Sequence, residues 1–90
     1  MPVSIWNHTY STTVPNDKSN LIPDADFVQM ARDGFDRQAD SVGATIIAFR
    51  DLGEVPPGDI PASVEAALGR PRTDYVWRKF EADAQRITEW

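Results

Sequence analysis

The sequence predicts a mainly α-helical domain with an extended N-terminal arm. Three observations support this: an uncharged N-terminal segment rich in β-branched and aromatic residues, a long repeat of apolar side chains at intervals of seven, and a last segment with apolar residues at helical spacing. A chain of 90 residues has the length of one domain. We therefore expect a single domain over 1–90, with an arm and connector over 1–22 and a helical body over 23–90.

The arm is expected over residues 2–14. This segment has no Asp, Glu, Lys or Arg and no helical repeat, and its residue types favour a strand. A lone strand needs a partner, so we expect the arm to pair with a second strand, to pair with its copy in a dimer, or to lie across the helices. Residues 15–23 contain two prolines together with Asn, Asp and Ser, which is typical of a connector.

The first helix is expected over about 24–52. Asp24 is a suitable N-cap, because its carboxylate can accept hydrogen bonds from the free amides of the first turn. Gly53 and the prolines that follow it are typical of a helix end. Between these signals, apolar residues recur at intervals of seven and place one stripe along the helix: Val28, Phe35, Val42 and Phe49.

An alternative ends this helix at Gly43. Gly34 and Gly43 each cost a helix about 1 kcal/mol relative to alanine. If the helix ends at Gly43, residues 44–50 would form a buried strand beside the N-terminal strand 2–10, and the fold would be α+β with a β-α-β unit. The long helix is favoured because the repeat continues through Phe49 and the stronger end signal lies further on.

Two more helices are expected after the prolines. A short helix over about 60–68 has its apolar residues on one side and ends at Gly69. A C-terminal helix over about 73–90 begins at Thr73, a suitable N-cap, and its apolar face consists of Val76, Phe80, Ile87 and Trp90.

Composition argues against several classes of function. Fourteen acidic and nine basic side chains give a net charge of −5, which repels phosphate backbones and anionic lipids, so we expect neither a nucleic acid nor a membrane as partner. No stretch approaches the roughly 18 apolar residues of a membrane span, and the N-terminal segment has no signal-peptide pattern, so we expect a cytoplasmic location. Without cysteine there are no disulfides, thiolate metal sites or cysteine nucleophiles.

No group of residues indicates catalysis. His8 is the single histidine, and it has no cysteine or carboxylate near it in sequence to complete a metal site or a catalytic triad. The five glycines are scattered and form no phosphate-binding motif, and the Asp-rich segments do not fit a calcium-binding loop. We therefore expect no enzyme activity, no metal and no cofactor. An enzyme would depend on pairs of Asp or Glu alone.

One candidate binding surface is acidic. Four aspartates share the side of the first predicted helix opposite the apolar stripe: Asp26, Asp33, Asp36 and Asp40. The simpler interpretation is a solvated face that keeps the domain soluble. The sharper interpretation is a stripe that docks on a basic surface of another protein, including a nucleic-acid channel.

A second candidate surface lies on the last predicted helix. It combines aromatic rings with a guanidinium group: Tyr75, Trp77, Arg78 and Trp90. These residue types dominate the energetic hot spots of protein interfaces. Core packing competes with this interpretation, because Val76, Phe80 and Ile87 already indicate which face turns inwards.

These observations predict a small acidic protein-binding module that acts as an inhibitor, an antitoxin-like neutraliser or an adaptor. Its expected partner is another protein, with a basic or nucleic-acid-binding surface. The alternative is a structural or accessory subunit of a homo- or hetero-oligomer, in which the N-terminal arm is completed by copies of the chain or by a larger assembly.

Overall fold

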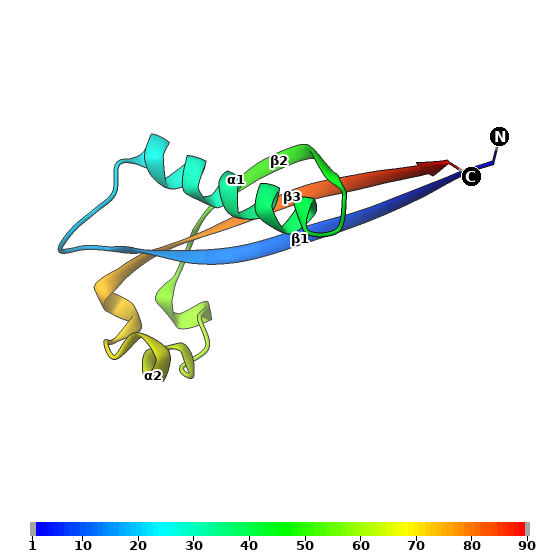
Figure 1. Ribbon diagram of the computed structural model, residues 1–90. Coiled ribbons are helices and arrows are strands. Elements are labelled where there is room, and N and C mark those ends of the chain that lie inside the picture. The colour runs from blue at the N-terminus through cyan, green and yellow to red at the C-terminus, as the bar shows by residue number, and fades with distance from the viewer. Residues whose placement is uncertain (1, 90) are drawn as a thin grey trace.

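The computed structural model describes residues 2–89, which form a three-stranded antiparallel sheet and one long helix. In chain order the elements are β1 (Val3–Asp17), α1 (Asp24–Asp40), β2 (Thr45–Val55), the 3-10 turn η1 (Pro57–Asp59), the short helix α2 (Val64–Leu68), the 3-10 turn η2 (Arg72–Asp74) and β3 (Tyr75–Glu89). The strand order is β1-β3-β2, so the last strand lies in the middle of the sheet. Figure 1 shows α1 on one face and the segment between β2 and β3 on the other.

The prediction of a mainly α-helical fold is wrong, and the largest error concerns the C-terminal segment. The helix expected over 73–90 is the strand β3, which pairs along its length with β1 and from Trp77 to Gln85 with β2. Phe80, Ala82 and Ala84 are fully buried at a spacing of two, the period of a strand. Hydrogen bonding to a strand on each side outweighs the helix propensity of the Ala, Glu, Gln and Arg residues in this segment.

The first helix is shorter than the range 24–52 that the sequence predicts. It begins at Asp24 as expected but ends at Asp40, before a turn in which Gly43 has φ +71°. The N–H of Ala44 donates to the carbonyl of Ala39 at 2.9 Å, and the N–H of Gly43 donates to the carbonyl of Asp40 at 3.1 Å. These two bonds form a Schellman motif, which requires a left-handed residue and therefore favours glycine.

Residues after this turn form a strand where the favoured prediction had helix. β2 occupies the region that the alternative reading assigned to a strand at 44–50, but it pairs with β3 and not with the N-terminal strand. The repeat of seven therefore does not mark one helix. Val42 lies in the turn with 38% of its surface exposed, and Phe49 belongs to β2.

Two other boundaries also differ. β1 continues through Pro15 to Asp17, so the connector is shorter than the predicted 15–23. Pro15 is tolerated because β1 lies at the edge of the sheet, where a missing N–H need not break a ladder bond. The short helix expected over 60–68 is only Val64–Leu68, and it ends at Gly69, whose left-handed φ is +71°.

The main core lies between α1 and the sheet. Phe27, Ala31 and Phe35 of the helix pack against Phe80 and Ala82 of β3. A second cluster near the end of the helix joins Ala39, Ala44 and Ala84. Alternate residues of a strand point to opposite faces, so the even-numbered residues of β3 face α1 and the odd-numbered ones face away. We call the surface turned away from α1 the open face.

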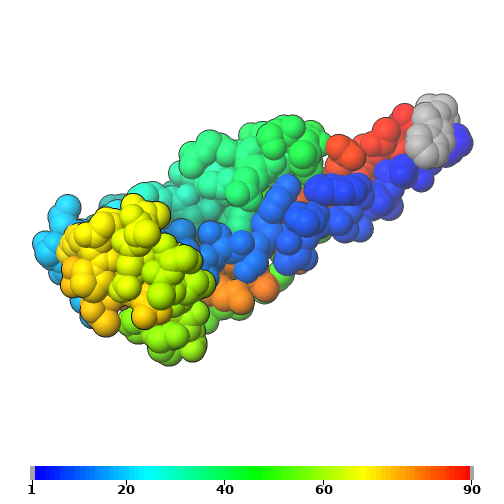
Figure 2. All heavy atoms as spheres, turned by 90° about the horizontal axis from the view of Figure 1, so that it is seen from below, coloured from blue at the N-terminus to red at the C-terminus, as the bar shows by residue number. Residues whose placement is uncertain are grey.

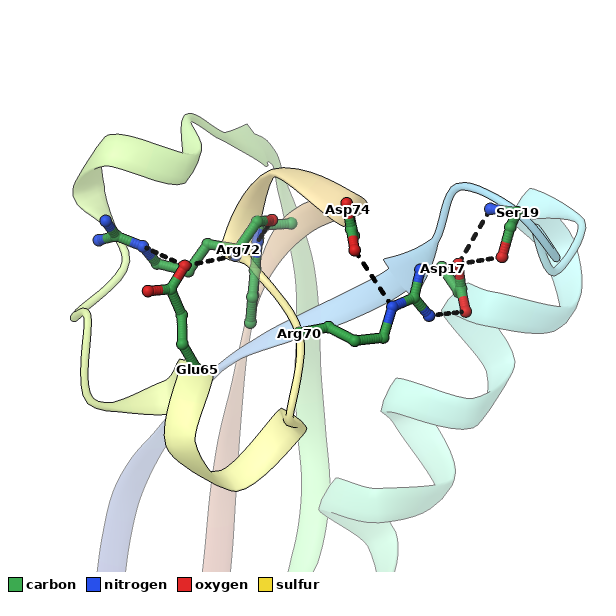
Figure 3. Close-up of polar contacts among 7 residues, drawn as sticks. Asp17, Ser19, Glu65, Arg70, Arg72 and Asp74 are labelled. Atoms are coloured by element: carbon green, nitrogen blue, oxygen red, sulfur yellow. Dashed lines mark hydrogen bonds and ion pairs between the residues drawn. The ribbon is translucent and has the colours of Figure 1, made fainter.

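The segment 56–74, called the excursion below, covers one end of the open face. It buries Trp77, which is only 4% exposed and whose Nε1 donates to the carbonyl of Arg72 at 2.9 Å. Figure 3 shows how the excursion is fastened to the end of β1: Arg70 donates to Asp17 at 2.6 Å and to Asp74 at 3.2 Å. The Arg72 backbone N–H donates to the Glu65 carboxylate at 2.8 Å, which connects η2 to α2 within the excursion.

The opposite end of the molecule is a ribbon of two strands. Thr45, the first residue of β2, pairs with Gln85, so residues 86–89 of β3 have only β1 beside them. The ribbon projects beyond both α1 and β2 (Figure 1), and the molecule measures 54 × 27 × 19 Å. Figure 2 looks onto the open face and shows the excursion at one end and the projecting ribbon at the other.

Candidate functional site

The free edge of β1 is the feature of this fold most suited to binding another protein. β1 is an outer strand of the sheet, and its pairing with β3 runs without a register shift from Val3 opposite Glu89 to Asp17 opposite Tyr75. Its sequence has no Asp, Glu, Lys or Arg before Asp17. A long, regular edge without charges is a ready template for another strand.

The other edge of the sheet is protected. β2 has register irregularities between Ile46 and Ala48 and again between Asp51 and Gly53. It also carries charged side chains at Arg50, Asp51 and Glu54. Bulges and charges are the usual devices that keep an edge strand from pairing with another chain. The two edges therefore differ, and only β1 is open to a further strand.

The backbone groups on the free edge follow from the hydrogen-bond pattern. In an antiparallel pair, alternate residues turn both N–H and C=O towards the neighbouring strand. Just beyond β1, the N–H of Lys18 donates to the carbonyl of Asp74 at 3.0 Å. Lys18 is even-numbered, so the backbone N–H and C=O groups of the even-numbered residues of β1 point towards β3, and those of the odd-numbered residues point to the free edge. Pro15 is odd-numbered, so its missing N–H falls on the free side. The outward positions are therefore Val3, Ile5, Asn7, Thr9, Ser11 and Thr13.

Side chains of these outward residues lie on the open face, and β3 holds two of them in place. Thr9 pairs with Asp83 in the sheet, and its Oγ1 donates to the Asp83 carboxylate at 2.8 Å. Gln85 donates through Nε2 to the Oδ1 of Asn7 at 3.2 Å. The middle of this strip, at Asn7 and Thr9, is thus polar and ordered by cross-strand bonds.

An ion-pair network continues this strip across the sheet to β2. Arg50 donates to Asp83 at 2.9 and 3.0 Å and to Glu81 at 3.2 Å. Hydrogen bonds from Arg50 and then from Thr9 lower the pKa of Asp83 to about 2. Hydrogen bonds from Asp83 and Glu81 raise the pKa of Arg50. An ionised carboxylate accepts hydrogen bonds from both neighbours, so this network orders the open face between β1 and β2.

Aromatic rings line the other side of β1. Trp6, His8 and Tyr10 lie in a row, with ring centroids 5.6 Å apart for the first pair and 4.6 Å for the second. The Arg86 guanidinium lies 5.3 Å from the Trp6 ring, and Tyr10 stacks on the buried Phe35. His8 is exposed, and its neighbours are rings and not carboxylates. The row presents apolar surface right up to the free edge.

The predicted acidic surface is found on α1, on the side away from the sheet. Asp26, Asp33 and Asp40 are exposed, and Asp36 is half-buried. Gln29 donates to Asp33 at 2.8 Å. Among residues 2–89 none of these four carboxylates takes part in an ion pair, in contrast to Asp24, which lies 3.2 Å from Arg78.

The predicted aromatic surface is not brought together by the fold. Trp77 is buried beneath the excursion with the half-buried Tyr75 beside it, their ring centroids 5.9 Å apart. Arg78 lies on the other face of β3, where it is bonded to Asp51 and to Asp24. Trp90 lies outside the described residues. Adjacent positions of a strand face opposite ways, so the helix geometry that joined these residues does not apply.

The open face has a hollow of about 550 Å³ where the excursion meets the sheet. Its walls include Thr13 from β1 and Trp77 and Lys79 from β3, and the excursion contributes apolar side chains from Ile60, Pro61 and Val64. Within the described range 2–89 no group of three potential ligands is placed to hold a metal ion. In the same range, no helix is long and apolar enough to cross a membrane.

Sequence reasoning identified the uncharged arm but missed the residues that order its edge. Arg50 and Asp83 were not singled out, because their contact depends on β2 and β3 being neighbours. Their only sequence signal is the spacing of two at Phe80, Ala82 and Ala84, which marks β3 as a strand. Comparison with protein-family models, curated proteins and solved structures gives no match. The functional conclusion therefore rests on the geometry of the chain itself.

Proposed function

We propose that this chain is a small protein-binding module whose partner adds a strand to the free edge of β1. The observation that carries the proposal is the contrast between the two edges: β1 is regular and uncharged, whereas β2 is bulged and charged. In strand addition, main-chain hydrogen bonds supply affinity and the alternating side chains supply specificity. The outward N–H and C=O groups of β1 offer a ladder of this kind.

The surfaces that flank the edge suggest what the partner strand looks like. On the open face it would lie beside Asn7 and Thr9, whose side chains are fixed by bonds to β3. On the face that carries α1 it would lie beside the rings of Trp6 and Tyr10. We therefore expect a strand that alternates small or polar residues with aromatic or β-branched ones.

The acidic side of α1 is a second candidate surface. Asp26, Asp33 and Asp40 are exposed without ion-pair partners in the described chain, so they can attract a basic surface. Contacts between exposed charges weaken as salt increases, whereas a backbone ladder depends little on salt. Salt dependence thus separates the two surfaces.

The proposal is tested by capture of binding proteins from the native host on immobilised chain. Ser11→Pro removes one outward N–H and repeats what Pro15 already does on this edge, while Ser11→Ala removes only the hydroxyl. We expect a protein held at high salt by the wild type and by Ser11→Ala but lost with Ser11→Pro. A protein that all three chains retain equally would contradict binding at the β1 edge.

The second surface has its own test. Replacing Asp33, Asp36 and Asp40 together by Lys reverses the charge on the outer side of α1 without touching the buried residues of the helix. If the partner binds the edge, the triple variant keeps it. If the partner binds the acidic side, the triple variant loses it and helicity measured by circular dichroism is unchanged. Unchanged binding rules out the acidic surface as the docking site.

A further inference from the structure

We infer that the strand added at the β1 edge is β1 of a second copy of this chain, paired antiparallel about a twofold axis that passes between the two His8 residues. This inference rests on the proposed function, because it uses the same edge. It identifies the partner and fixes the register of the pairing. The result is a continuous six-stranded sheet with both α1 helices on one face.

Charge favours this pairing. A twofold interface brings a surface against its own copy, so any charge on the edge near the axis would meet a like charge. β1 carries no Asp, Glu, Lys or Arg before Asp17, although the whole chain has a net charge of −5. The acidic aspartates lie on the outer side of α1, away from the edge. The free edge of β1 is therefore the part of an acidic molecule that a second acidic copy can approach.

Backbone geometry limits the register. Hydrogen-bonded pairs form only between outward positions of the two strands. With His8 opposite His8, every outward position of each copy has a partner: Val3 with Thr13, Ile5 with Ser11, and Asn7 with Thr9. A shift by two residues one way brings in Pro15, which has no N–H to donate.

The shape of the open face supports the same register. The ribbon tip carries exposed apolar side chains at Val3, Ile5 and Ile87, with 52%, 57% and 58% of their surfaces exposed. All three are odd-numbered and face away from α1. The hollow beside Thr13 lies on this face as well and has Ile60, Pro61 and Val64 in its walls.

Pairing about His8 brings these two features together. Val3 of one copy then lies beside Thr13 of the other, so each ribbon tip reaches the hollow of its partner. A shift of the register by two residues would move Val3 about 7 Å along the partner strand and away from Thr13, at 3.3 Å per residue. Covering the tip removes exposed apolar surface from water at both ends of the interface.

The face that carries α1 is also compatible. In this register Trp6 of one copy lies opposite Tyr10 of the other, and the two His8 rings meet at the axis. Each row of rings would thus be extended across the interface. Cross-strand aromatic pairs stabilise a sheet, so both faces of the joined strands gain contacts.

Cysteine mapping tests the register directly, because the chain has no cysteine of its own. Residues opposite each other in an antiparallel pair have Cα atoms about 4.5–5.5 Å apart, within the range of a disulfide. We expect His8→Cys to form a disulfide-linked dimer rapidly under mild oxidation. Asn7→Cys and Thr9→Cys should do so slowly when separate and rapidly when mixed. A cysteine at exposed Ser63 gives the background rate.

Two results overturn the register. One is a His8→Cys dimer that forms no faster than the Ser63→Cys dimer. The other is an Asn7→Cys or Thr9→Cys chain that links to itself faster than the two link to each other. Either would place the twofold axis elsewhere or remove it.

The oligomeric state tests the inference without cysteines. Sedimentation of the wild type should give a dimer at micromolar concentration. Ser11→Pro and Ile5→Lys should each raise the dissociation constant of this dimer at least tenfold. Both variants should keep the circular dichroism spectrum of the wild type. Ile5→Lys is a second variant that keeps the test valid if the proline impairs folding. It places a charge on the edge at an exposed position, where the fold itself tolerates it. A wild-type chain that stays monomeric at every concentration overturns the inference.

The outcomes also separate this inference from the proposed function. If the wild type is monomeric but Ser11→Pro still loses a captured protein, the second copy is wrong and strand addition by another protein stands. If Ser11→Pro neither weakens a dimer nor loses a captured protein, both fail.

Discussion

Arg50 of β2 reaches across the open face of β3 and donates two hydrogen bonds to Asp83, at 2.9 and 3.0 Å. This contact joins β2 to the strip that borders the free edge, because Asp83 also accepts a hydrogen bond from Thr9 of β1. Three strands are thereby linked through one carboxylate. Both oxygens of Asp83 accept in this arrangement, and protonation would turn one of them into a donor and remove the negative charge beside Arg50, so the link depends on pH.

The first prediction concerns acid. The pKa of Asp83 is lowered to about 2, so its contribution to stability is complete above the unfolded-state pKa of about 3.9 and is lost as pH falls through the folded-state value. At pH 7, Asp83→Asn should melt below the wild type. The gap between the two melting temperatures should close between about pH 4 and about pH 2. A gap that stays constant over this range in calorimetry would contradict the role of the carboxylate.

The second prediction concerns Trp77, which anchors the excursion. Trp77→Phe keeps most of the packing but leaves the Arg72 carbonyl without its indole donor, so we expect a loss of about 1–2 kcal/mol in the free energy of unfolding. Trp77→Ala also opens a cavity under the excursion and should cost about 3–5 kcal/mol. Urea unfolding followed by circular dichroism measures both. Equal losses for the two variants would mean that the ring contributes little beyond its hydrogen bond.

The third prediction compares two glycines. Gly43 has a left-handed φ of +71°, so Gly43→Ala should destabilise the chain by about 1–2 kcal/mol even though its Cβ would meet nothing closer than 3.8 Å. Gly34 lies inside α1 with nothing within 4 Å of a Cβ, so Gly34→Ala should stabilise it by about 0.5–1 kcal/mol. Melting temperatures should shift in opposite directions. A shift in the same direction would contradict the helix end at Gly43.

The fourth prediction compares two prolines on β1. The N–H of Ser11 turns outward and that of Thr12 turns towards β3, so only Thr12→Pro removes a ladder bond. We expect Thr12→Pro to cost about 3 kcal/mol or more and Ser11→Pro much less, measured on dilute protein. The reverse order would show that the even-numbered residues face outward and would contradict the outward positions on which the pairing inferred above depends.

Local signals in the sequence were sufficient for β1 and for the start of α1. The uncharged, β-branched residues 2–14 predicted a strand, and β1 is found over Val3–Asp17. The helix start near Asp24 is also found, but the predicted role of Asp24 as the N-cap is wrong, because Pro23 is the N-cap and no side chain caps the helix. Strand propensity is a local signal that acts within a few residues.

The second half depends on contacts between distant residues. β3 contains Glu81, Ala82, Ala84, Gln85 and Arg86, which favour a helix when considered alone. Its position between β1 and β2 supplies partners for both sides of its backbone, and this can be known only when the sheet order is known. The helix end at Gly43 was predicted only as the alternative, because Val42 and Phe49 prolong the repeat of seven by coincidence.

The candidate site was predictable in part. The sequence of the N-terminal strand, which is uncharged, already indicates that this strand needs a partner. Helical spacing already indicates that Asp26, Asp33 and Asp40 share one side of α1. The edge that is free, the residues that turn outward and the hollow that faces the ribbon tip all depend on the pairing with β3. For the same reason, helix spacing joined Trp77 and Arg78, which the strand places on opposite faces.

Residue-resolved amide hydrogen exchange tests the role of the β1 edge most directly. It should be measured on the dilute chain and on the chain bound to its partner, whether a second copy or a captured protein. In the complex, the amides of Ile5, Asn7, Thr9 and Ser11 should exchange much more slowly, while their even-numbered neighbours, already bonded to β3, should change little. Protection confined to α1 or β2, with the odd-numbered amides of β1 exchanging at the dilute rate, would contradict it.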